Sequence, residues 1–523
     1  MAHARMSSAR LDPLTSWHAD WRGLRVAVLG LSVTGFSVAD TLAELGADVL
    51  VVTESADGEY ARLLPVIGAH LHVGPLDTVP SELVDFAPEV VIASPGFSPQ
   101  HPLVLWAQES GVALWGDVEL AWRVRDKVVR ADGAPADWVL VTGTNGKTTT
   151  TRLAATMMVH GGLRAAPCGN IGVPVLDAVR DPAGFDVLVV ELSSHQLWYL
   201  GLQSGPEPLS PHAAVCLNLA DDHLEWHGSF QAYRDAKAVV YANTRVACVY
   251  NKADAATRAM VEDAEVVEGA RAIGFDLGVP GPSDLGLVDG ILVDRAFLEE
   301  RSTSALELTT VADLAARGLA APHVVANILA AAALARSLGV EPPAIREALD
   351  EFALDPHRIQ VVAVSGGITW VDDSKATNPH AAASSLAAYP GAVWVVGGLL
   401  KGVDIGGLIA SRGSIAKAAI VIGVDRGEIV AAFARHAPGV PLFEVDHAET
   451  EDVMARVVEL AAGVAADGDV VLLAPASASF DQFDSYADRG RRFARAVTDR
   501  IDNGKAPRDS DHPAEDAPEQ SGP

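Results

Sequence analysis

The residues best suited to a chemical role lie in the loop GTNGKT, which begins at Gly143 and follows an apolar run. A glycine-rich loop between a strand and the start of a helix directs backbone N–H groups toward phosphate. Lys147 would reach the outer phosphates of a nucleotide, and the Thr148 hydroxyl would ligate magnesium. The full phosphate-loop pattern has another glycine where this chain has Val141. The loop is therefore a short form, and a plain glycine turn with an exposed lysine is the alternative.

Three further sets of residues in the same segment are also suited to a chemical role. Glu191 follows the predicted strand 186–190, where a carboxylate beside a phosphate loop suits a nucleotide's magnesium. The stretch NLADDHLEWH at 218–227 gathers acidic and histidine side chains. It fits a metal or phosphate site, although on its own an acidic turn that caps a helix is the slightly favoured interpretation. Lys237, in the helical stretch YRDAKAVVY, is by itself typical of a solvated helix face.

Three polar loops follow predicted parallel strands near the C-terminus. They are DDSKATN at 372–378, the loop that ends at Lys401, and Ser477–Ser479. Because the carboxyl ends of parallel strands meet at one edge of a sheet, we expect these loops to line one crevice. Their ammonium and hydroxyl groups suit an anionic amino-acid substrate. Solvated loops often have the same composition, so each loop alone is weak evidence.

The elements that must position these residues alternate between strands and helices, which predicts an α/β fold of three domains. We expect a Rossmann-like domain at 1–134, a central phosphate-loop ATPase-like domain at 135–355 and a Rossmann-like domain at 356–500. The proline-rich, polar segment 501–523 is predicted to be a disordered tail. In the first domain, Ser32 replaces the second glycine of the dinucleotide pattern, which disfavours an NAD-dependent dehydrogenase.

The composition narrows the choice of partners. The formal net charge of the 523-residue chain is −29, and such a surface repels nucleic acid and anionic membranes. The three cysteines lack the paired spacing of zinc sites and disulfide frameworks. We find neither a secretory signal nor a run of about 18 apolar residues. We therefore expect a cytoplasmic protein with small-molecule partners, and nothing in the sequence requires more than a monomer.

Taken together, the motifs resemble those of the Mur ligase family over residues 23–493. The matching stretches, all in the family's order, are VLGLSVTG, IASPGFSPQHP, TGTNGKTTT, GNIGVPVL, VVELSSHQL, NLADDHLEWHGSF, YRDAKAVVY, LDPHR, DDSKATNPHA, GGLLKG and APASASFDQFDSYADRG.

The resemblance implies a reaction and a division of labour. The first domain would bind the UDP part of a substrate, the second ATP and the third an amino acid. GLSVTG and SPGFSPQHP point to the branch that joins D-glutamate to UDP-N-acetylmuramoyl-L-alanine through an acyl phosphate, in peptidoglycan synthesis. A sister ligase for another amino acid, folylpolyglutamate synthetase, and a non-catalytic phosphate-loop regulator that binds a UDP-sugar remain as alternatives.

The resemblance also implies residue roles. Lys147 would contact the β- and γ-phosphates, Thr148 and Glu191 one magnesium ion, and His223 a second ion together with a carbamylated Lys237. Asn170 would contact the reacting carboxylate. Nucleotide contacts are further implied for Gly143, Thr144, Asn145, Gly146, Thr149, Asn327, Arg358 and Asp373. Contacts to the two other substrates are implied for Val33, Thr34, Ser94, Lys375, Thr377, Lys401, Ser479 and Tyr486.

The chain departs from the family pattern at three places. Thr53-Glu54 stands where an Asp followed by Thr or Ser contacts uracil, which puts that hydrogen bonding in doubt. Tyr486 replaces the usual phenylalanine against D-glutamate and adds a hydroxyl. Leu399 and Leu400 precede Lys401 where a polar residue is common, so the shape of the pocket is expected to differ slightly.

Overall fold

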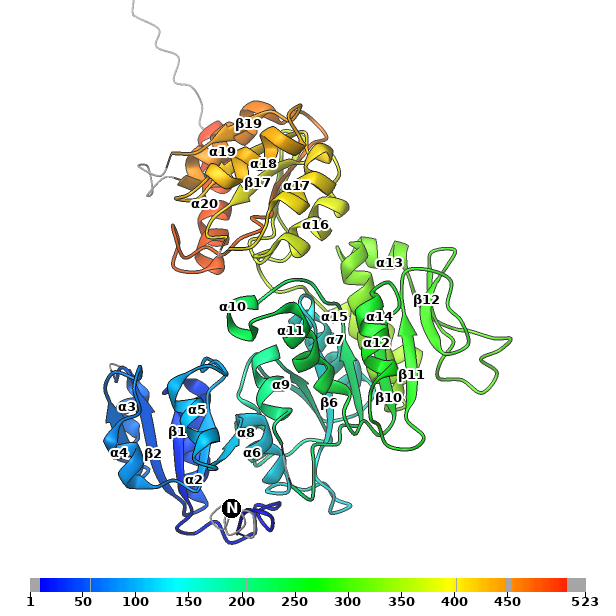
Figure 1. The fold of residues 1–523 in the computed structure, drawn as a ribbon. Coiled ribbons are helices and arrows are strands. Elements are labelled where there is room, and N and C mark those ends of the chain that lie inside the picture. Colours follow the sequence, from blue (N-terminus) through cyan, green and yellow to red (C-terminus); the bar gives the residue numbers. More distant parts are fainter. Residues whose placement is uncertain (1–9, 57, 204, 401, 447–452, 506–523) are drawn as a thin grey trace, which may run out of the picture. The chain divides into compact units, whose positions relative to one another are not determined.

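The computed structural model describes residues 10–56, 58–203, 205–400, 402–446 and 453–505. The chain divides into two compact units, 1–354 and 355–523. The first unit contains two sheets and the second unit contains one, and helices flank all three (Figure 1).

The first sheet consists of five parallel strands in the order β3-β2-β1-β4-β5. Alternate residues of the central strand pack into two different cores, with Val26 and Val28 on one face and Ala27 and Leu29 on the other. This is expected of a parallel sheet that is covered on both faces. The strands are β1 (Arg25–Leu29), β2 (Asp48–Thr53), β3 (His70–Val73), β4 (Val90–Ala93) and β5 (Ala113–Trp115), and the helices α2 (Val33–Glu44), α3 (Glu59–Leu63), α4 (Ser81–Phe86), α5 (Pro102–Glu109) and α6 (Asp117–Arg123).

The second sheet has the order β14-β13-β12-β11-β10-β9-β6-β8-β7, and only its β12-β13-β14 end is antiparallel. The alanine-rich helix α14 packs beside α7, and its small, buried side chains allow a close approach. The strands are β6 (Asp137–Thr142), β7 (Ala165–Gly169), β8 (Val187–Glu191), β9 (Ala213–Cys216), β10 (Ala247–Asn251), β11 (Arg271–Phe275), β12 (Asp284–Val288), β13 (Ile291–Asp294) and β14 (Leu306–Thr310). The helices are α7 (Lys147–His160), α8 (Val175–Arg180), α9 (Ser194–Leu200), α10 (Leu224–His227), α11 (Phe230–Ala238), η1 (Val239–Tyr241), α12 (Ala255–Glu262), α13 (Val311–Ala316), α14 (Pro322–Ser337) and α15 (Pro342–Glu351).

The third sheet has the order β15-β16-β20-β17-β18-β19, and its edge strand differs from the parallel unit that the sequence predicts. β15 is antiparallel to β16 because only Gly366 and Gly367 connect the two strands, both with positive φ. Such a two-residue hairpin can join only antiparallel strands. The strands are β15 (Gln360–Ser365), β16 (Ile368–Asp372), β17 (Val393–Gly397), β18 (Ala418–Ile422), β19 (Leu442–Glu444) and β20 (Val470–Leu473), and the helices α16 (Pro379–Ala388), α17 (Gly406–Arg412), η2 (Gly413–Ile415), α18 (Gly427–His436), α19 (Val453–Val464) and α20 (Tyr486–Lys505).

Helix α20 extends into the segment that the sequence analysis assigned to a disordered tail. The prediction is wrong for residues 501–505, which are helical. Phe493, Val497 and Ile501 follow one another at intervals of four residues and pack on the core of the second unit, which explains the extra turn. Residues 506–523 of the predicted tail lie outside the described residues.

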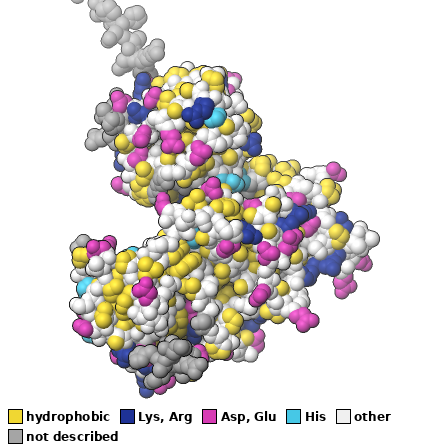
Figure 2. All heavy atoms as spheres, viewed as in Figure 1, with side chains coloured by type: hydrophobic (Ala, Val, Ile, Leu, Met, Phe, Trp, Pro, Cys, Tyr) yellow, Lys and Arg dark blue, Asp and Glu magenta, His cyan; other side chains and the backbone are white. Residues whose placement is uncertain are grey.

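The surface is consistent with the strongly negative charge. Figure 2 shows acidic side chains scattered over the visible face rather than gathered in one patch. In the described part of the chain, no helix is both long enough and apolar enough to cross a membrane. The three cysteines are free and buried.

The β15–β16 hairpin provides a test of the fold. At Gly366 an added Cβ would meet open space, whereas at Gly367 it would lie 1.6 Å from Asp467 Oδ1. The left-handed backbone alone should cost about 1 kcal/mol of unfolding free energy in Gly366→Ala. We expect Gly367→Ala to cost more, because Asp467 must also move. Urea unfolding followed by circular dichroism would measure both, and equal midpoints would contradict the predicted contact.

Candidate functional site

The phosphate loop joins β6 to α7, and its shape depends on glycine. Gly146 caps α7 with φ +87°, and an added Cβ there would lie 2.5 Å from Asn327 Oδ1 on α14. The start of α7 has no side-chain cap. Gly146 has no side chain that could cap the first-turn N–H groups, and a helix N-terminus of this kind favours phosphate.

Neighbouring side chains fix the loop in place. The Asn218 amide bonds the backbone of Asn145 in both directions, with N···O distances of 2.9 Å. The Thr144 hydroxyl lies 2.8 Å from the Tyr233 hydroxyl. The loop is therefore held by the segment after β9 and by α11, rather than by its own turn alone.

Two lysine amines meet at one backbone oxygen of this loop. Lys147 Nζ donates to the Gly143 carbonyl at 2.8 Å, and Lys237 Nζ donates to the same oxygen at 3.0 Å. Lys237 is only 1% exposed, so its interpretation as a solvated helix residue is wrong. Burial, followed by the charge of Lys147, lowers the pKa of Lys237 to about 7. An amine with such a pKa is substantially neutral at physiological pH and can act as a nucleophile.

Glu191 supplies a buried carboxylate beside the loop. It ends β8, pairs in register with Val141 of β6 and is 1% exposed. Asn170 Nδ2 donates to its Oε1 atom at 2.9 Å, whereas its Oε2 atom is buried without a hydrogen-bond partner among the described residues. A buried carboxylate oxygen of this kind is costly unless a cation or a donor approaches it. The site therefore fits a hard divalent cation.

A histidine cluster lies beside these groups. His223 precedes α10 with φ +53°, and its ring centroid lies 4.7 Å from that of His195. Burial, with a smaller contribution from neighbouring positive groups, lowers the pKa of His195 to about 3 and that of His227 to about 4. Both rings are thus neutral at physiological pH. His195 is not among the predicted site residues, although its position four residues after Glu191 was a usable signal.

The predicted metal ligands do not form a conventional cage. No group of three or more His, Cys, Asp and Glu side chains in the described segments could hold a metal ion. Of the predicted set, only Glu191 and His223 belong to these types. A cation would therefore depend on the Thr148 hydroxyl, on the nucleotide and on a modified Lys237.

The polar loops of the second unit do come together. The Ser374 hydroxyl donates to the Tyr486 carbonyl at 2.7 Å, and Leu399 and Ala478 exchange backbone hydrogen bonds. Lys375 Nζ lies 3.8 Å from the centroid of the Tyr486 ring. The Ala476 N–H donates to the Ala376 carbonyl at 2.9 Å, so the loops after β16, β17 and β20 are joined, as the crevice prediction requires. Lys401 lies outside the described residues.

A buried arginine that the sequence analysis missed organises this crevice. Arg489 is 0% exposed, donates to the Ser374 carbonyl at 2.9 Å and to the Ser477 carbonyl at 3.2 Å, and thereby ties α20 to two of the loops.

Ser479, a predicted substrate contact, is also buried, at 3% exposure. Asp373 lies below the surface, where it accepts a hydrogen bond from Ser385, and burial raises its pKa to about 6. Arg358 lies 3.8 Å from Asp355, and Thr377 is half-buried.

The first sheet offers a separate anion site. The loop between β1 and α2 brings Val33 and Thr34 to the start of α2, whose N-cap Ser32 makes no side-chain capping bond. Ser94 Oγ is buried without a hydrogen-bond partner in the described residues. A helix N-terminus without a side-chain cap, together with this hydroxyl, suits a diphosphate. Thr53 is 8% exposed, whereas Glu54 is exposed.

Comparisons with known proteins decide the family. The model "Mur ligase middle domain" matches residues 141–335, and "Mur ligase, glutamate ligase domain" matches residues 357–477. The UDP-N-acetylmuramoylalanine–D-glutamate ligase of Leifsonia xyli subsp. xyli is 62% identical over 95% of this chain and 97% of its own length. The chain belongs to the Mur ligase family. The Tropheryma whipplei (strain Twist) protein of the same name is 45% identical over 94% of this chain and 99% of its own length.

Solved Mur ligases share the fold. MurF from Acinetobacter baumannii aligns with a TM-score of 0.54 at 16% identity, over 95% of this chain and 98% of that one. MurF ligase from Thermotoga maritima, solved with ADP, aligns with a TM-score of 0.52 at 19% identity, over 87% and 96%. The predicted α/β class with three sheet regions is thereby confirmed.

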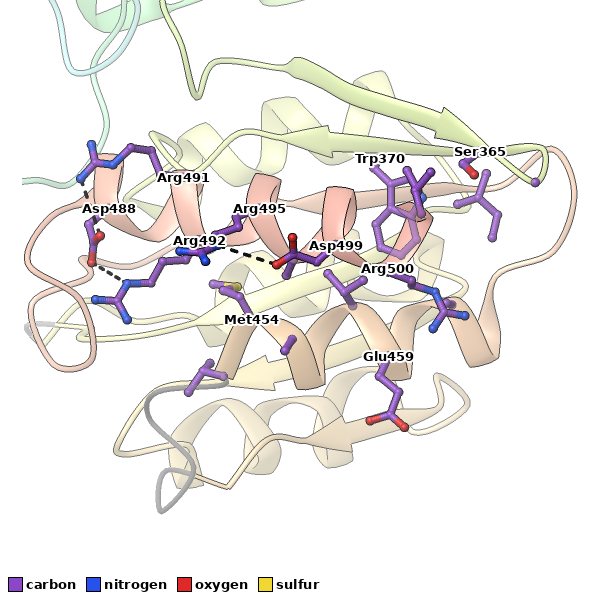
Figure 3. A pocket seen from close by; sticks show the side chains of 18 of the residues that line it. Ser365, Trp370, Met454, Glu459, Asp488, Arg491, Arg492, Arg495, Asp499 and Arg500 are labelled. Atoms are coloured by element: carbon purple, nitrogen blue, oxygen red, sulfur yellow. Dashed lines mark hydrogen bonds and ion pairs between the residues drawn. The ribbon is translucent and has the colours of Figure 1, made fainter. Parts of the chain in front are cut away.

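A separate hollow in this Mur ligase lies between α19 and α20. It has a volume of about 1520 Å³, with Trp370 and Met454 among its apolar lining and arginines of α20 along its side (Figure 3). Arg492 is paired with Asp488 of its own helix at 3.0 Å. None of the described residues predicted for substrate or nucleotide contacts lines this hollow.

The buried carboxyl of Asp117, beside α9, predicts a specific pH dependence. Asp117 accepts a hydrogen bond from Gln196 of α9 at 2.9 Å, and burial raises its pKa from 3.8 to about 6. Because the folded state binds this proton more tightly than the unfolded state, the stability that it contributes is lost as pH rises through about 6. We therefore expect Asp117→Asn to gain stability relative to the wild type between pH 4 and pH 7. Denaturant unfolding across this range would measure the gain.

The control for this experiment is Asp20→Asn, a change at an exposed position. Its stability should follow the wild-type profile. If Asp117→Asn also followed the wild-type profile, the burial of an ionisable carboxyl at this position would be contradicted.

Proposed function

We propose that this chain joins D-glutamate to UDP-N-acetylmuramoyl-L-alanine with hydrolysis of ATP to ADP and phosphate, in the cytoplasmic synthesis of peptidoglycan precursors. The observation that carries the proposal is the unsatisfied Glu191 oxygen beside an ordered phosphate loop. Relatives named as D-glutamate ligases match the chain along almost its full length, which supports the substrate assignment.

The first step activates a carboxylate, which is by itself a poor acyl donor. An oxygen of the muramoyl carboxylate attacks the γ-phosphorus of ATP, the bond to the β-phosphate oxygen breaks, and ADP leaves an acyl phosphate behind. Such a transfer depends on positioning and on neutralising negative charge. Lys147 and the N–H groups of the loop would hold the β- and γ-phosphates, and Asn170 would orient the carboxylate. Magnesium bound at Thr148 and Glu191 would supply further neutralisation.

The second buried amine has its own role in the proposal. Lys237 would attack CO2 and lose a proton to form a carbamate, which replaces a positive charge with a negative one. The pKa of about 7 supports this reaction because it leaves much of the amine unprotonated. The carbamate, together with His223, would hold a second magnesium ion. The change would also relieve the repulsion between two amines that share one carbonyl oxygen.

The second unit would bind D-glutamate, whose amine receives the acyl group. The amine of D-glutamate attacks the acyl carbon, and the tetrahedral intermediate releases phosphate and forms the amide. Thr377, Lys401 and Ser479 would bind the carboxylates of D-glutamate. Lys375 would support the same pocket, with Tyr486 against the side of the amino acid. The Lys375–Tyr486 contact and the burial of Ser479 support a compact polar pocket.

The remaining contacts complete the proposal. Asn327, which lies against Gly146, would contact the adenine. Gly143–Thr149 would surround the phosphates, while Arg358 and Asp373 would reach phosphate and ribose. Val33, Thr34 and Ser94 would bind the diphosphate of the muramoyl substrate. We assign these roles to domains at 1–134, 135–355 and 356–500 of a monomer.

The decisive assay measures phosphate release from ATP with UDP-N-acetylmuramoyl-L-alanine and one of several amino acids. We expect release with D-glutamate, and none above background with L-glutamate, L-alanine or meso-diaminopimelate. Release with another amino acid would retain the mechanism but assign a sister reaction. No release with any amino acid would contradict ligase activity and favour a non-catalytic nucleotide-binding protein.

Removal of the Lys237 amine tests the role proposed for the carbamate. We expect Lys237→Ala to lower kcat on the order of 1,000-fold, because a ligand for transition-state charge is lost. Added bicarbonate should not restore activity, whereas a high concentration of a short carboxylic acid should restore part of it. Lys417→Ala, which breaks a surface ion pair with Asp469, should retain wild-type activity. Full activity of Lys237→Ala would exclude the proposed role.

A further inference from the structure

Helices α8 and α9, which contact elements of the first sheet region, begin shortly after Asn170 and Glu191 in the sequence. α8 begins five residues after Asn170, and α9 begins three residues after Glu191. On α9, the Tyr199 hydroxyl donates to the Phe97 carbonyl at 2.7 Å and Gln196 donates to Asp117 at 2.9 Å. In Figure 1, α8 lies beside α6 where the two sheet regions of the first unit meet.

Helix α8 contacts α2 mainly through one arginine, Arg180. Arg180 Nη2 contacts Asp40 Oδ2 at 2.6 Å and Glu44 Oε2 at 2.8 Å, while its Nη1 donates to Thr41 Oγ1 at 3.1 Å. One turn earlier on α8, Asp177 accepts a hydrogen bond of 2.5 Å from Ser37. The α2 partners recur at three- and four-residue intervals and therefore form one face of the helix.

These contacts differ from an ordinary surface ion pair. An isolated exposed pair contributes little to stability. Here one guanidinium, 17% exposed, joins two carboxylates and the hydroxyl of Thr41, which is 0% exposed. Lys127 Nζ contacts the other oxygen of Glu44 at 2.5 Å. The network therefore fixes the orientation of α2 along its length.

We propose that Arg180 is a positioning residue that sets the distance between the diphosphate loop at the start of α2 and the Asn170–Glu191 pair. This inference rests on the proposed function. A single donor molecule must reach both places, with its diphosphate at one and its carboxylate at the other. Binding energy at the diphosphate end accelerates phosphoryl transfer only if the span between the two places is fixed. The described hydrogen-bond partners of Arg180 all lie on α2, so in this inference it acts through α2 and not on the reacting atoms.

The test separates positioning from simple structural support. In Arg180→Met, we expect kcat/KM for UDP-N-acetylmuramoyl-L-alanine to fall about 10- to 100-fold, the loss expected of a displacement of about 1 Å. The Kd values for UDP alone and for ADP alone, measured by calorimetry, should stay within about twofold of the wild type, because each local loop is intact. Arg180→Lys should recover part of kcat/KM, since it keeps one charged donor.

Matched variants keep the inference falsifiable. Arg164→Met removes another arginine–carboxylate pair of the same unit, with Asp186, and should leave kcat/KM unchanged. If Arg180→Met does not fold, Glu44→Gln removes one partner at a partly exposed site and should show the same pattern more weakly. An unchanged kcat/KM, or a loss of UDP affinity by the same factor, would overturn the inference. Failure of the wild type to ligate D-glutamate would instead refute the proposed function.

Discussion

Two lysine amines that share the carbonyl oxygen of Gly143 form the constraint on which the site depends. Like charges this close inside a protein repel strongly, and burial raises the cost further. The arrangement becomes favourable when phosphate oxygens arrive, when one amine is neutral or when one is converted to an anion. The Oε2 atom of Glu191 presents the opposite need, because it is buried and has no hydrogen-bond partner among the described residues. The protein thus holds a charge pattern that nucleotide and cation would complete.

The second sheet and helix α11 hold these groups in place. Lys147, Glu191 and the segment around His223 lie at or after the ends of β6, β8 and β9, which are neighbours in the parallel part of one sheet. Their approach therefore results from topology. Lys237 reaches the same place from α11, across the carboxyl end of the sheet. Helices α8 and α9 follow β7 and β8 of this sheet, and both helices contact the first sheet region. Chemistry and substrate span are therefore determined by one set of elements.

The sequence predicted much of this arrangement because strand, loop and helix signals are local. The apolar runs of β6 and β8 and the glycines between β6 and α7 are sufficient to place the phosphate loop and Glu191. The burial of Lys237 could not be read from its helix, since it depends on packing against a strand far away in sequence. Arg489 was missed for the same reason, because its partners lie on loops more than ten and one hundred residues away. The antiparallel β15 was readable from Gly366-Gly367, but the run of parallel units obscured it.

The most direct test of this account follows the oxygen of the donor carboxylate. If the muramoyl carboxylate attacks ATP, then a substrate labelled with 18O in that carboxylate must transfer one label to the phosphate that is released when D-glutamate is joined. Mass spectrometry of the phosphate would detect the transfer. Our account predicts one 18O atom per phosphate formed. Unlabelled phosphate accompanied by amide formation would show that the carboxylate is not phosphorylated, and would contradict the role assigned to the charge pattern around Gly143.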